Sequence, residues 1–225
     1  MDPDRFTSAR FGTVNREPGN KASFFYFRPA PIPRGLELRP RTVQLLSEAD
    51  AAVGQLQGLS QVIQDPELLV GPYLRREAVA SSRIEGTQAS LSDLLQSEAS
   101  EGEPISEDVA EVERYLAATR HGYEAIRTLP ITQRLIIELH EILLDGVRGR
   151  DKLPGQLRRS PVWIGAAHDN PDTAVFVPPL PSVLPESLAD WEEFVNTPGQ
   201  LPVLIRCALM HYQFETIHPF LDGNG

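Results

Sequence analysis

His-Pro-Phe-Leu-Asp-Gly-Asn-Gly occupies residues 218–225, directly after a long apolar segment at residues 201–217. A proline disfavours helical backbone at the residue before it and lacks the N–H that a helix interior needs. We therefore expect Pro219 to help end the preceding helix and to place His218 outside helical geometry. An imidazole at that point has a suitable pKa to act as a general base.

The second half of this stretch is rich in residues that allow unusual backbone angles. Gly223 and Gly225 flank Asn224, and glycines with positive φ can turn successive backbone N–H groups into one anion-binding concavity. Phosphate is the usual anion of such a nest, and Asp222 could hold a Mg²⁺ ion bound to that phosphate. The alternative is an ordinary turn after a helix, because Gly, Asn and Asp are common turn residues.

The composition is that of a globular chain with one substantial core. The 225 residues include 41% hydrophobic and 23% charged positions, and the formal net charge of -10 argues against general nucleic-acid binding. Because no apolar run approaches the length of a membrane span and no signal-peptide pattern is present, we predict a cytoplasmic protein that binds no membrane. The single cysteine, Cys207, lies in an apolar helical pattern and is predicted to be a buried thiol.

The periodicity of apolar residues predicts a mostly α-helical protein. Stripes at helical spacing indicate helices from about Thr42 to Gly58 and from Glu107 to Thr128. A further helix is expected to open at Pro72 and to end at Gly86, since proline is favoured in a first helical turn. Ser90 and Asp93 have the spacing of a capping box, which predicts the start of another short helix.

Segments outside these helices are predicted from their local composition. Residues 1–41, which are rich in proline, arginine and aromatics, are expected to form an extended arm. Residues 162–164 and 174–177 carry the strand signals, and a long polar tip between them suggests a hairpin. The segment at residues 201–217 is apolar on nearly every side, which predicts a central, buried helix.

A second informative motif, Ser-Ser-Arg-Ile-Glu-Gly, lies at residues 81–86, where one of these helices should end. On that helix Leu74, Ala78, Ser81 and Glu85 fall on one face. A carboxylate on a packed face needs a cationic or hydrogen-bonding partner, because burying it alone is costly. The alternative is that Glu85 is exposed to solvent or pairs with a nearby arginine of its own helix.

Residues 218–225 resemble the signature loop of Fic-domain proteins, His-Pro-Phe-x-Asp-Gly-Asn-Gly-Arg-x-x-x-Arg, at every position that can be compared. The resemblance implies a mostly α fold, with a Fic-type helical core and a small β-hairpin flap, that transfers AMP from ATP to a hydroxyl group of a protein. It implies that His218 is the general base, that Asp222 binds Mg²⁺ and that Phe220 also anchors the loop in the core. The residues implied to bind ATP are Phe220, Leu221, Asp222, Gly223, Asn224 and Gly225.

The motif at residues 81–86 also resembles this family. Ser81-x-x-x-Glu85-Gly86 matches the inhibitory motif of Fic proteins, Ser/Thr-x-x-x-Glu-Gly/Asn, in its N-terminal position. The resemblance implies that Glu85 reaches the ATP site, where it would claim the second arginine of the loop and inhibit transfer. The domains expected are an N-terminal arm and helical module at residues 1–106 and a Fic core at residues 107–225.

The predicted hairpin corresponds to the flap of Fic proteins. The flap, at residues 162–177, is implied to align the backbone of a target protein by adding a strand to it, with the chain itself among the candidate targets. The preceding Gly-Gln-Leu-Arg at residues 155–158 resembles the family as well. Arg158 and Arg159 are nevertheless expected to be ordinary surface charges.

The resulting hypothesis is a protein adenylyltransferase that uses ATP and Mg²⁺ and is autoinhibited by Glu85. One alternative is a deAMPylase in which Glu85 positions water to remove AMP, and another is a non-catalytic regulatory or interaction protein. The two motif arginines would come after Gly225, where the given sequence stops. We therefore expect the 225-residue chain by itself to bind ATP weakly and to transfer little AMP, since arginines make the strongest contacts to phosphate.

Overall fold

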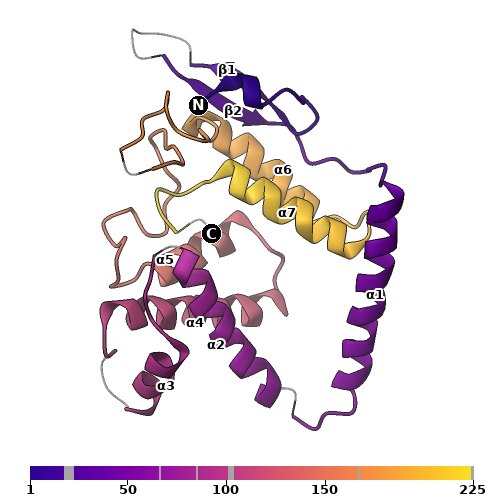
Figure 1. The fold of residues 1–225 in the computed structure, drawn as a ribbon, viewed down its shortest axis with the longest axis vertical. Coiled ribbons are helices and arrows are strands. Elements are labelled where there is room, and N and C mark those ends of the chain that lie inside the picture. The colour runs from indigo at the N-terminus through magenta and orange to yellow at the C-terminus, as the bar shows by residue number, and fades with distance from the viewer. Residues whose placement is uncertain (18–22, 66, 85, 101–103, 167, 224–225) are drawn as a thin grey trace. The chain divides into compact units, whose positions relative to one another are not determined.

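The structure of the 225-residue chain is a computed structural model, which describes all residues except 18–22, 66, 85, 101–103, 167 and 224–225. The described chain is mostly helical and has a two-strand antiparallel sheet (Figure 1). It folds as two compact units: a first unit of Met1–Gly35, Pro130–Ile137 and Gln156–Gly225, and a second unit of Leu36–Leu129 and Glu138–Gly155. No described helix is both long enough and apolar enough to span a membrane. The predicted domains 1–106 and 107–225 stay a prediction.

The first unit contains a hairpin near the N-terminus. Strands β1 (Gly12–Arg16) and β2 (Phe25–Pro29) pair antiparallel, with Val14 opposite Phe27, and a short 3₁₀ helix, η1 (Pro3–Arg5), precedes them. The prediction of an extended arm is therefore wrong for the paired residues 12–16 and 25–29, whereas residues 30–39 form no regular secondary structure. Aromatic residues favour strands. Pro29 is the last residue of β2, and Pro31 and Pro33 follow it, so no proline interrupts the pairing.

Strand β2 of this hairpin packs on residues 174–177, the end of the predicted flap. The main-chain N–H of Phe27 donates a hydrogen bond of 2.8 Å to the carbonyl of Val177. A cluster of buried residues surrounds this contact, formed by Met1, Tyr26, Phe27, Ala174 and Val177. The N-terminal hairpin thus supports one side of residues 174–177.

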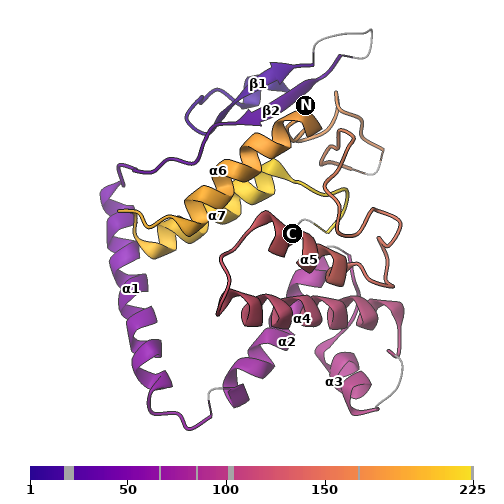
Figure 2. The same cartoon turned by 180° about the vertical axis from the view of Figure 1, so that it is seen from behind.

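Two helices complete the first unit. Helix α6 (Leu184–Asn196), which follows the 3₁₀ helix η2 (Pro181–Val183), lies side by side with α7 (Val203–Ile217), as Figures 1 and 2 show. The indole N–H of Trp191 donates to the carbonyl of Met210 at 3.0 Å, which ties the two helices together. Gln213 of α7 donates to the carbonyl of Ala30 at 2.9 Å, just after β2.

The described residues cover only one side of helix α7. Its buried residues are Leu209, Gln213, Thr216 and Ile217. Val203 is 64% exposed and Cys207 is exposed as well. The predictions of a central, buried helix and of a buried thiol are therefore wrong, because an apolar composition shows what a helix could bury and not what packs against it.

The second unit is built from the helices in the middle of the chain. They are α1 (Pro40–Ser60), α2 (Glu67–Ile84), α3 (Leu91–Ala99) and α4 (Glu107–Ile126). Its buried core is formed by Ala78, Val79, Ala89, Leu94, Val109, Val112 and Leu116. Helix α5 (Gln133–Leu143) begins in the first unit and ends in the second. No residue of α1 is buried.

Short-range sequence patterns correctly predicted the positions of most of these helices. The Ser90 hydroxyl accepts from the Asp93 N–H, and the Asp93 carboxylate accepts from the Ser90 N–H, so the predicted capping box is confirmed. The prediction that a helix opens at Pro72 is wrong, because α2 begins at Glu67 and contains the proline. The helix continues through Pro72 although a proline there cannot donate to the carbonyl four residues earlier.

Candidate functional site

The loop at residues 218–223 leaves α7 through an unusual backbone conformation. His218 caps the helix with φ 48° and ψ 65°, in the left-handed region, and its N–H donates to the carbonyl of Phe214 at 2.9 Å. The expectation that Pro219 places His218 outside helical geometry is confirmed. A residue with a Cβ atom adopts these angles at a cost of roughly 1–2 kcal/mol, so the surrounding contacts must hold it there.

The imidazole of His218 is held in its neutral form. Burial, reinforced by the nearby Arg158 cation, lowers the pKa of His218 to about 4, while the Asp222 carboxylate and the Glu215 carbonyl act in the opposite direction. The Nδ1 atom of the ring is buried and has no hydrogen-bond partner among the described residues. The ring is therefore unprotonated at neutral pH, as a general base requires.

The rest of the described loop divides into an anchored half and an exposed half. Phe220 is 2% exposed, so the expectation that it anchors the loop in the core is confirmed. Asp222 is exposed, and its Oδ1 accepts a hydrogen bond of 3.0 Å from the N–H of Gly223, which has φ 65°. The predicted nest residues Asn224 and Gly225 lie outside the described residues. The ATP and Mg²⁺ contacts of all these residues stay predictions.

Arg158 lies next to His218 and was not recognised from the sequence. It was predicted to be a surface charge, but its side chain is 2% exposed, whereas its neighbour Arg159 is exposed as predicted. Burial lowers the pKa of the Arg158 guanidinium to about 10, which still leaves it charged at neutral pH. Its hydrogen bonds run to main-chain carbonyls around the loop. The similarity of residues 155–158 to the Fic family was the signal that could have marked this arginine.

The predicted flap forms a loop with one point of strand pairing. Ile164 and Phe176 make a single antiparallel bridge, with N–H···O distances of 2.8 and 3.1 Å in the two directions. The tip is held by side chains instead, since the Asp169 carboxylate accepts from the Ala166 N–H and from the Thr173 hydroxyl. The prediction of two full strands is therefore wrong in extent. Trp163, which precedes the bridge, is 44% exposed.

The motif at residues 81–86 ends α2 in a well-defined C-terminal cap. Gly86 has φ 97°, its N–H donates to the carbonyl of Arg83, and the N–H of Thr87 donates to the carbonyl of Ser82. These two bonds form the Schellman pattern, which often places glycine at this position. The prediction that Gly86 ends the helix is confirmed. Ser81 is partly buried and donates to the Glu77 carboxylate at 3.1 Å.

Glu85 itself lies outside the described residues. Of the face predicted to carry it, Ala78 is buried and Leu74 is packed against the core of the second unit. The loop with His218 belongs to the first unit. The predicted contact between Glu85 and the phosphate loop therefore stays a prediction.

A polar network fixes the chain directly after this motif. The Thr87 side chain is buried, and its hydroxyl donates to the Glu111 carboxylate at 2.7 Å. Arg148 pairs with the same carboxylate oxygen at 2.9 Å. Nothing in the local sequence pattern links these three residues, because they come from separate parts of the second unit.

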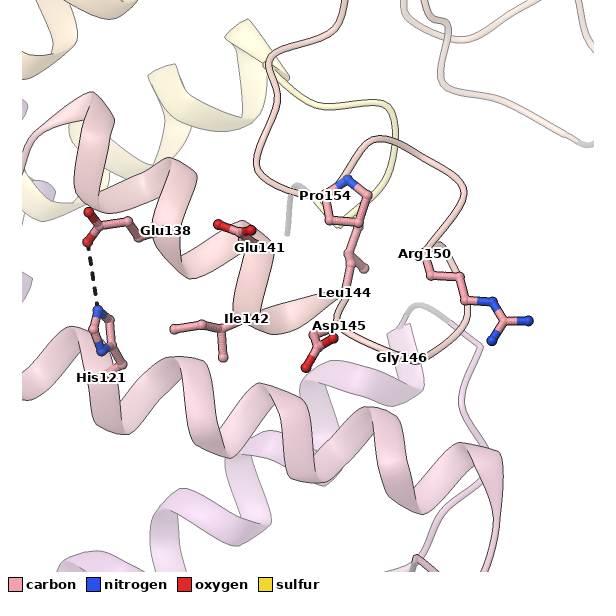
Figure 3. A pocket seen from close by; sticks show the side chains of 9 residues that line it. All are labelled: His121, Glu138, Glu141, Ile142, Leu144, Asp145, Gly146, Arg150 and Pro154. Atoms are coloured by element: carbon pink, nitrogen blue, oxygen red, sulfur yellow. Dashed lines mark ion pairs between the residues drawn. The ribbon is translucent and has the colours of Figure 1, made fainter.

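The second unit also contains an open cavity of about 570 Å³ (Figure 3). It is lined by His121, Glu138, Glu141, Ile142, Leu144, Asp145, Gly146, Arg150 and Pro154. His121 and Glu138 are 3.8 Å apart, and the Arg150 guanidinium extends away from the carboxylates in Figure 3. No group of three or more His, Cys, Asp or Glu side chains in the described chain is arranged to hold a metal ion. The carboxylates that line the cavity do not by themselves identify a ligand, and we assign none.

Two family models match this combination of helices and loop. The Fic/DOC family N-terminal model matches residues 43–124, and the Fic/DOC family model matches residues 130–225. Together they span most of the sequence. The chain is a Fic/DOC family domain protein, and the resemblance drawn from its two motifs is confirmed at the level of the family.

Curated relatives share part of the chain. The protein adenylyltransferase Fic of Drosophila willistoni is 33% identical over 105 residues, which are 44% of this chain and 18% of the fly protein. The protein of the same name in Drosophila yakuba is 32% identical over 105 residues, with the same shares. The matched part thus spans less than a fifth of these relatives.

Solved structures share the fold over more of the chain. A Fic family protein from Desulfovibrio desulfuricans G20 is similar with a TM-score of 0.64 and 25% identity, over 84% of this chain and 55% of that one. A segment of Fic-1 from C. elegans is similar with a TM-score of 0.61 and 22% identity, over 83% and 56% of the two chains. The predicted fold class, a mostly helical Fic-type fold, is confirmed. Its two-strand sheet is formed by β1 and β2.

Proposed function

We propose that this protein transfers AMP from ATP to a hydroxyl group of a protein side chain. The observation that carries the proposal is the neutral imidazole of His218, held at the end of α7 four residues before the exposed carboxylate of Asp222. Its membership of the Fic/DOC family, which typically catalyses protein AMPylation, supports the same reaction. The adenylyltransferase names of the relatives support it too.

In the proposed reaction, a ring nitrogen of His218 accepts the proton of the target hydroxyl. The hydroxyl oxygen forms a bond to the α-phosphorus of ATP, the bond from that phosphorus to its bridging oxygen breaks, and pyrophosphate leaves. The loop from Phe220 onward would bind the phosphates through backbone N–H groups, since Gly223 already has a positive φ. Phe220, which is buried, would hold the loop against the core while it does so.

The residues present fit a Mg²⁺ ion shared with the substrate. Asp222 offers one exposed carboxylate, and no larger cluster of metal-binding side chains lies in the described part of the chain. Mg²⁺ commonly takes one or two carboxylates and completes its shell with phosphate oxygens and water. When bound, such an ion would neutralise charge on the phosphates.

The target protein would dock on the flap at residues 162–177. Ile164 of the bridge and its neighbours Trp163 and Val175 are exposed apolar side chains, and one residue pair is bridged among the described residues of the flap. Backbone groups next to such a bridge are available to pair with an incoming extended segment.

Regulation would come from Glu85 at the end of α2. The cap made by Gly86 and Thr87 supports this role because it fixes the backbone on the C-terminal side of Glu85. In the proposal Glu85 pairs with the second arginine of the complete loop, and Ser81 and Gly86 are the other regulatory residues. ATP would then bind with its α-phosphate away from the line of attack, an error of geometry that lowers the rate steeply.

The central experiment compares His218→Ala with the unchanged protein, each carrying the complete signature loop with both arginines. Incubation with labelled Mg·ATP should label protein in the unchanged chain, and the substitution should lower labelling by roughly 10²–10⁴-fold, as is typical when a general base is lost. Circular dichroism shows whether the variant is folded. Full labelling by a folded His218→Ala variant would rule out the proposed base.

A second experiment separates the inhibitory role of Glu85 from the two alternatives. Glu85→Gly should raise transfer and leave ATP affinity unchanged. If Glu85 instead positions water, the variant should fail to remove AMP from a purified modified target. A protein with the complete loop that neither binds Mg·ATP nor transfers or removes AMP would be a regulatory or interaction protein.

A further inference from the structure

Arg158 is a buried cation whose side-chain hydrogen bonds, among the described residues, all run to main-chain carbonyl oxygens. Its Nε donates to His218 at 2.8 Å, and its Nη1 donates to Ser160 at 3.3 Å. Its Nη2 donates to Pro179 at 2.5 Å and to Ile217 at 3.3 Å. Within the described residues it makes no ion pair with a carboxylate. A planar guanidinium, with its donors in a fixed fork, is suited to hold several oxygens in one arrangement.

The carbonyls that accept hydrogen bonds from Arg158 belong to separate segments of the chain. Ile217 and His218 lie at the end of α7 and at the start of the loop, whereas Pro179 follows the flap. The backbone of Arg158 adds to this, because its N–H donates to the carbonyl of Pro219 at 2.9 Å. A cation at this place is also favoured by the partial negative charge at the C-terminus of a helix.

These bonds hold His218, the one non-glycine residue with a left-handed backbone in the described part of the loop. His218 has a left-handed φ of 48°, its N–H is bonded to Phe214 and its carbonyl is bonded to Arg158. Both peptide groups that flank its Cα are therefore fixed. The direction of the Cα–Cβ bond follows from these two peptide planes. The contacts therefore also fix the direction in which the side chain leaves the backbone.

We propose that Arg158 is a positioning residue, which holds the backbone of His218 in its left-handed conformation and so aims the imidazole, while it ties the start of the loop to the residues after the flap. The effect on the imidazole as a base rests on the proposed function. The effect on the backbone rests on the hydrogen bonds alone, so the two can be tested separately.

The test uses Arg158→Lys and Arg158→Met, with Arg159→Lys and Arg159→Met as matched controls at the exposed neighbour. Lysine keeps the charge, but its compact ammonium cannot reproduce the fork that serves four carbonyls. In the protein with the complete loop, Arg158→Lys should stay folded and lower kcat for AMP transfer by about 10- to 100-fold, since small errors of position are costly in rate. KM for Mg·ATP should stay within about threefold. Both Arg159 variants should match the unchanged protein.

The backbone is followed by hydrogen–deuterium exchange in the same proteins and in the 225-residue chain. Exchange of the peptide covering residues 214–223 should become at least about tenfold faster in Arg158→Lys, while peptides from α6 stay unchanged. If Arg158→Met is unfolded, the lysine variant alone decides the outcome.

The outcomes distinguish the two proposals. If the unchanged protein with the complete loop transfers no AMP, the proposed function fails, but faster exchange in Arg158→Lys would still support the positioning of the backbone. If Arg158→Lys has unchanged exchange at residues 214–223, the positioning role is overturned, whatever the activity. A kcat that falls only in proportion to the fraction of unfolded protein would overturn the role in aiming the imidazole.

Discussion

His218 is the residue proposed to act as the base, and its environment suits it to accept a proton at neutral pH. Burial and the Arg158 cation both disfavour the imidazolium form, so the lone pair of the ring stays available. The same environment makes it a weaker base than an exposed histidine. In the proposed reaction, its position at the start of the loop proposed to bind phosphate, rather than its strength as a base, would then account for catalysis.

The first prediction concerns the pH dependence of AMP transfer by the protein with the complete loop. With the pKa of His218 lowered to about 4, the rate should be level from neutral pH down to about pH 5.5 and should fall only on approach to pH 4. Protonation removes the acceptor, and the lowered pKa moves that loss to more acidic solution. Single-turnover rates at saturating Mg·ATP measure it. An acid limb centred near pH 6.5, the ordinary value for histidine, would contradict the burial of the ring.

Stability provides the control for this measurement. Because the pKa of His218 is lower in the folded chain than in the unfolded chain, the unfolded chain binds the proton first as the pH falls from about 6.5 to about 4. The fold should therefore lose stability over that window. His218→Gln should lose less, and circular dichroism at each pH excludes unfolding as the cause of a lower rate.

At the scale of the element, the end of α2 depends on one glycine. Gly86 adopts φ 97°, and a Cβ atom placed on it would meet no other atom within 4 Å. A substitution there therefore tests the backbone angle alone, without a steric clash. This matters for function because the residue before it, Glu85, is the proposed inhibitor.

The second prediction compares two glycine substitutions. Gly86→Ala should lower the free energy of unfolding by about 1–2 kcal/mol, since a residue with a Cβ atom is strained at a positive φ. Gly54→Ala, inside α1 and also with open space around its Cα, should raise it by about 0.5–1 kcal/mol. Urea unfolding followed by circular dichroism gives both values. Equal effects of the two substitutions would show that Gly86 does not need its left-handed conformation.

At the scale of the whole molecule, the residues with proposed roles are divided between two compact units. The loop, Arg158 and the flap belong to the first unit, and the motif proposed to inhibit transfer belongs to the second. The proposed inhibition therefore involves residues of both units, whereas the residues proposed to carry the chemistry all belong to the first unit. The Glu85→Gly experiment tests the proposed inhibition.

The third prediction concerns the open side of α7 in the folded chain. Because Cys207 is exposed, its thiol should react fully with Ellman's reagent in native buffer within minutes, at one thiol per chain. Cys207→Ser should give no reaction, which is the control for reagent consumed elsewhere. A thiol that reacts only after urea is added would show that this side of α7 is covered in solution.

Most of the helices, the ends of several of them and the identity of the loop were predictable from the sequence. They depend on residues close together in the chain: the capping pair of Ser90 and Asp93, the glycine that ends α2, and the unbroken match from His218 to Gly225. Helical periodicity and turn chemistry act over a few residues, so a local pattern is sufficient to reveal them.

Contacts between distant segments decided the rest. The pairing of β1 with β2, and the docking of β2 on Val177, join segments that no local pattern relates. The burial of Arg158 is of the same kind, because its carbonyl partners in α7 and the loop follow it by about 60 residues. From sequence alone an arginine is expected at the surface, and only the tertiary structure shows that acceptors surround this one. An apolar residue such as Cys207 is expected to be buried, and only the fold shows that it is exposed. Burial is a property of the packed chain, so the sequence could indicate the proposed base and its loop but not the buried arginine that is hydrogen-bonded to them.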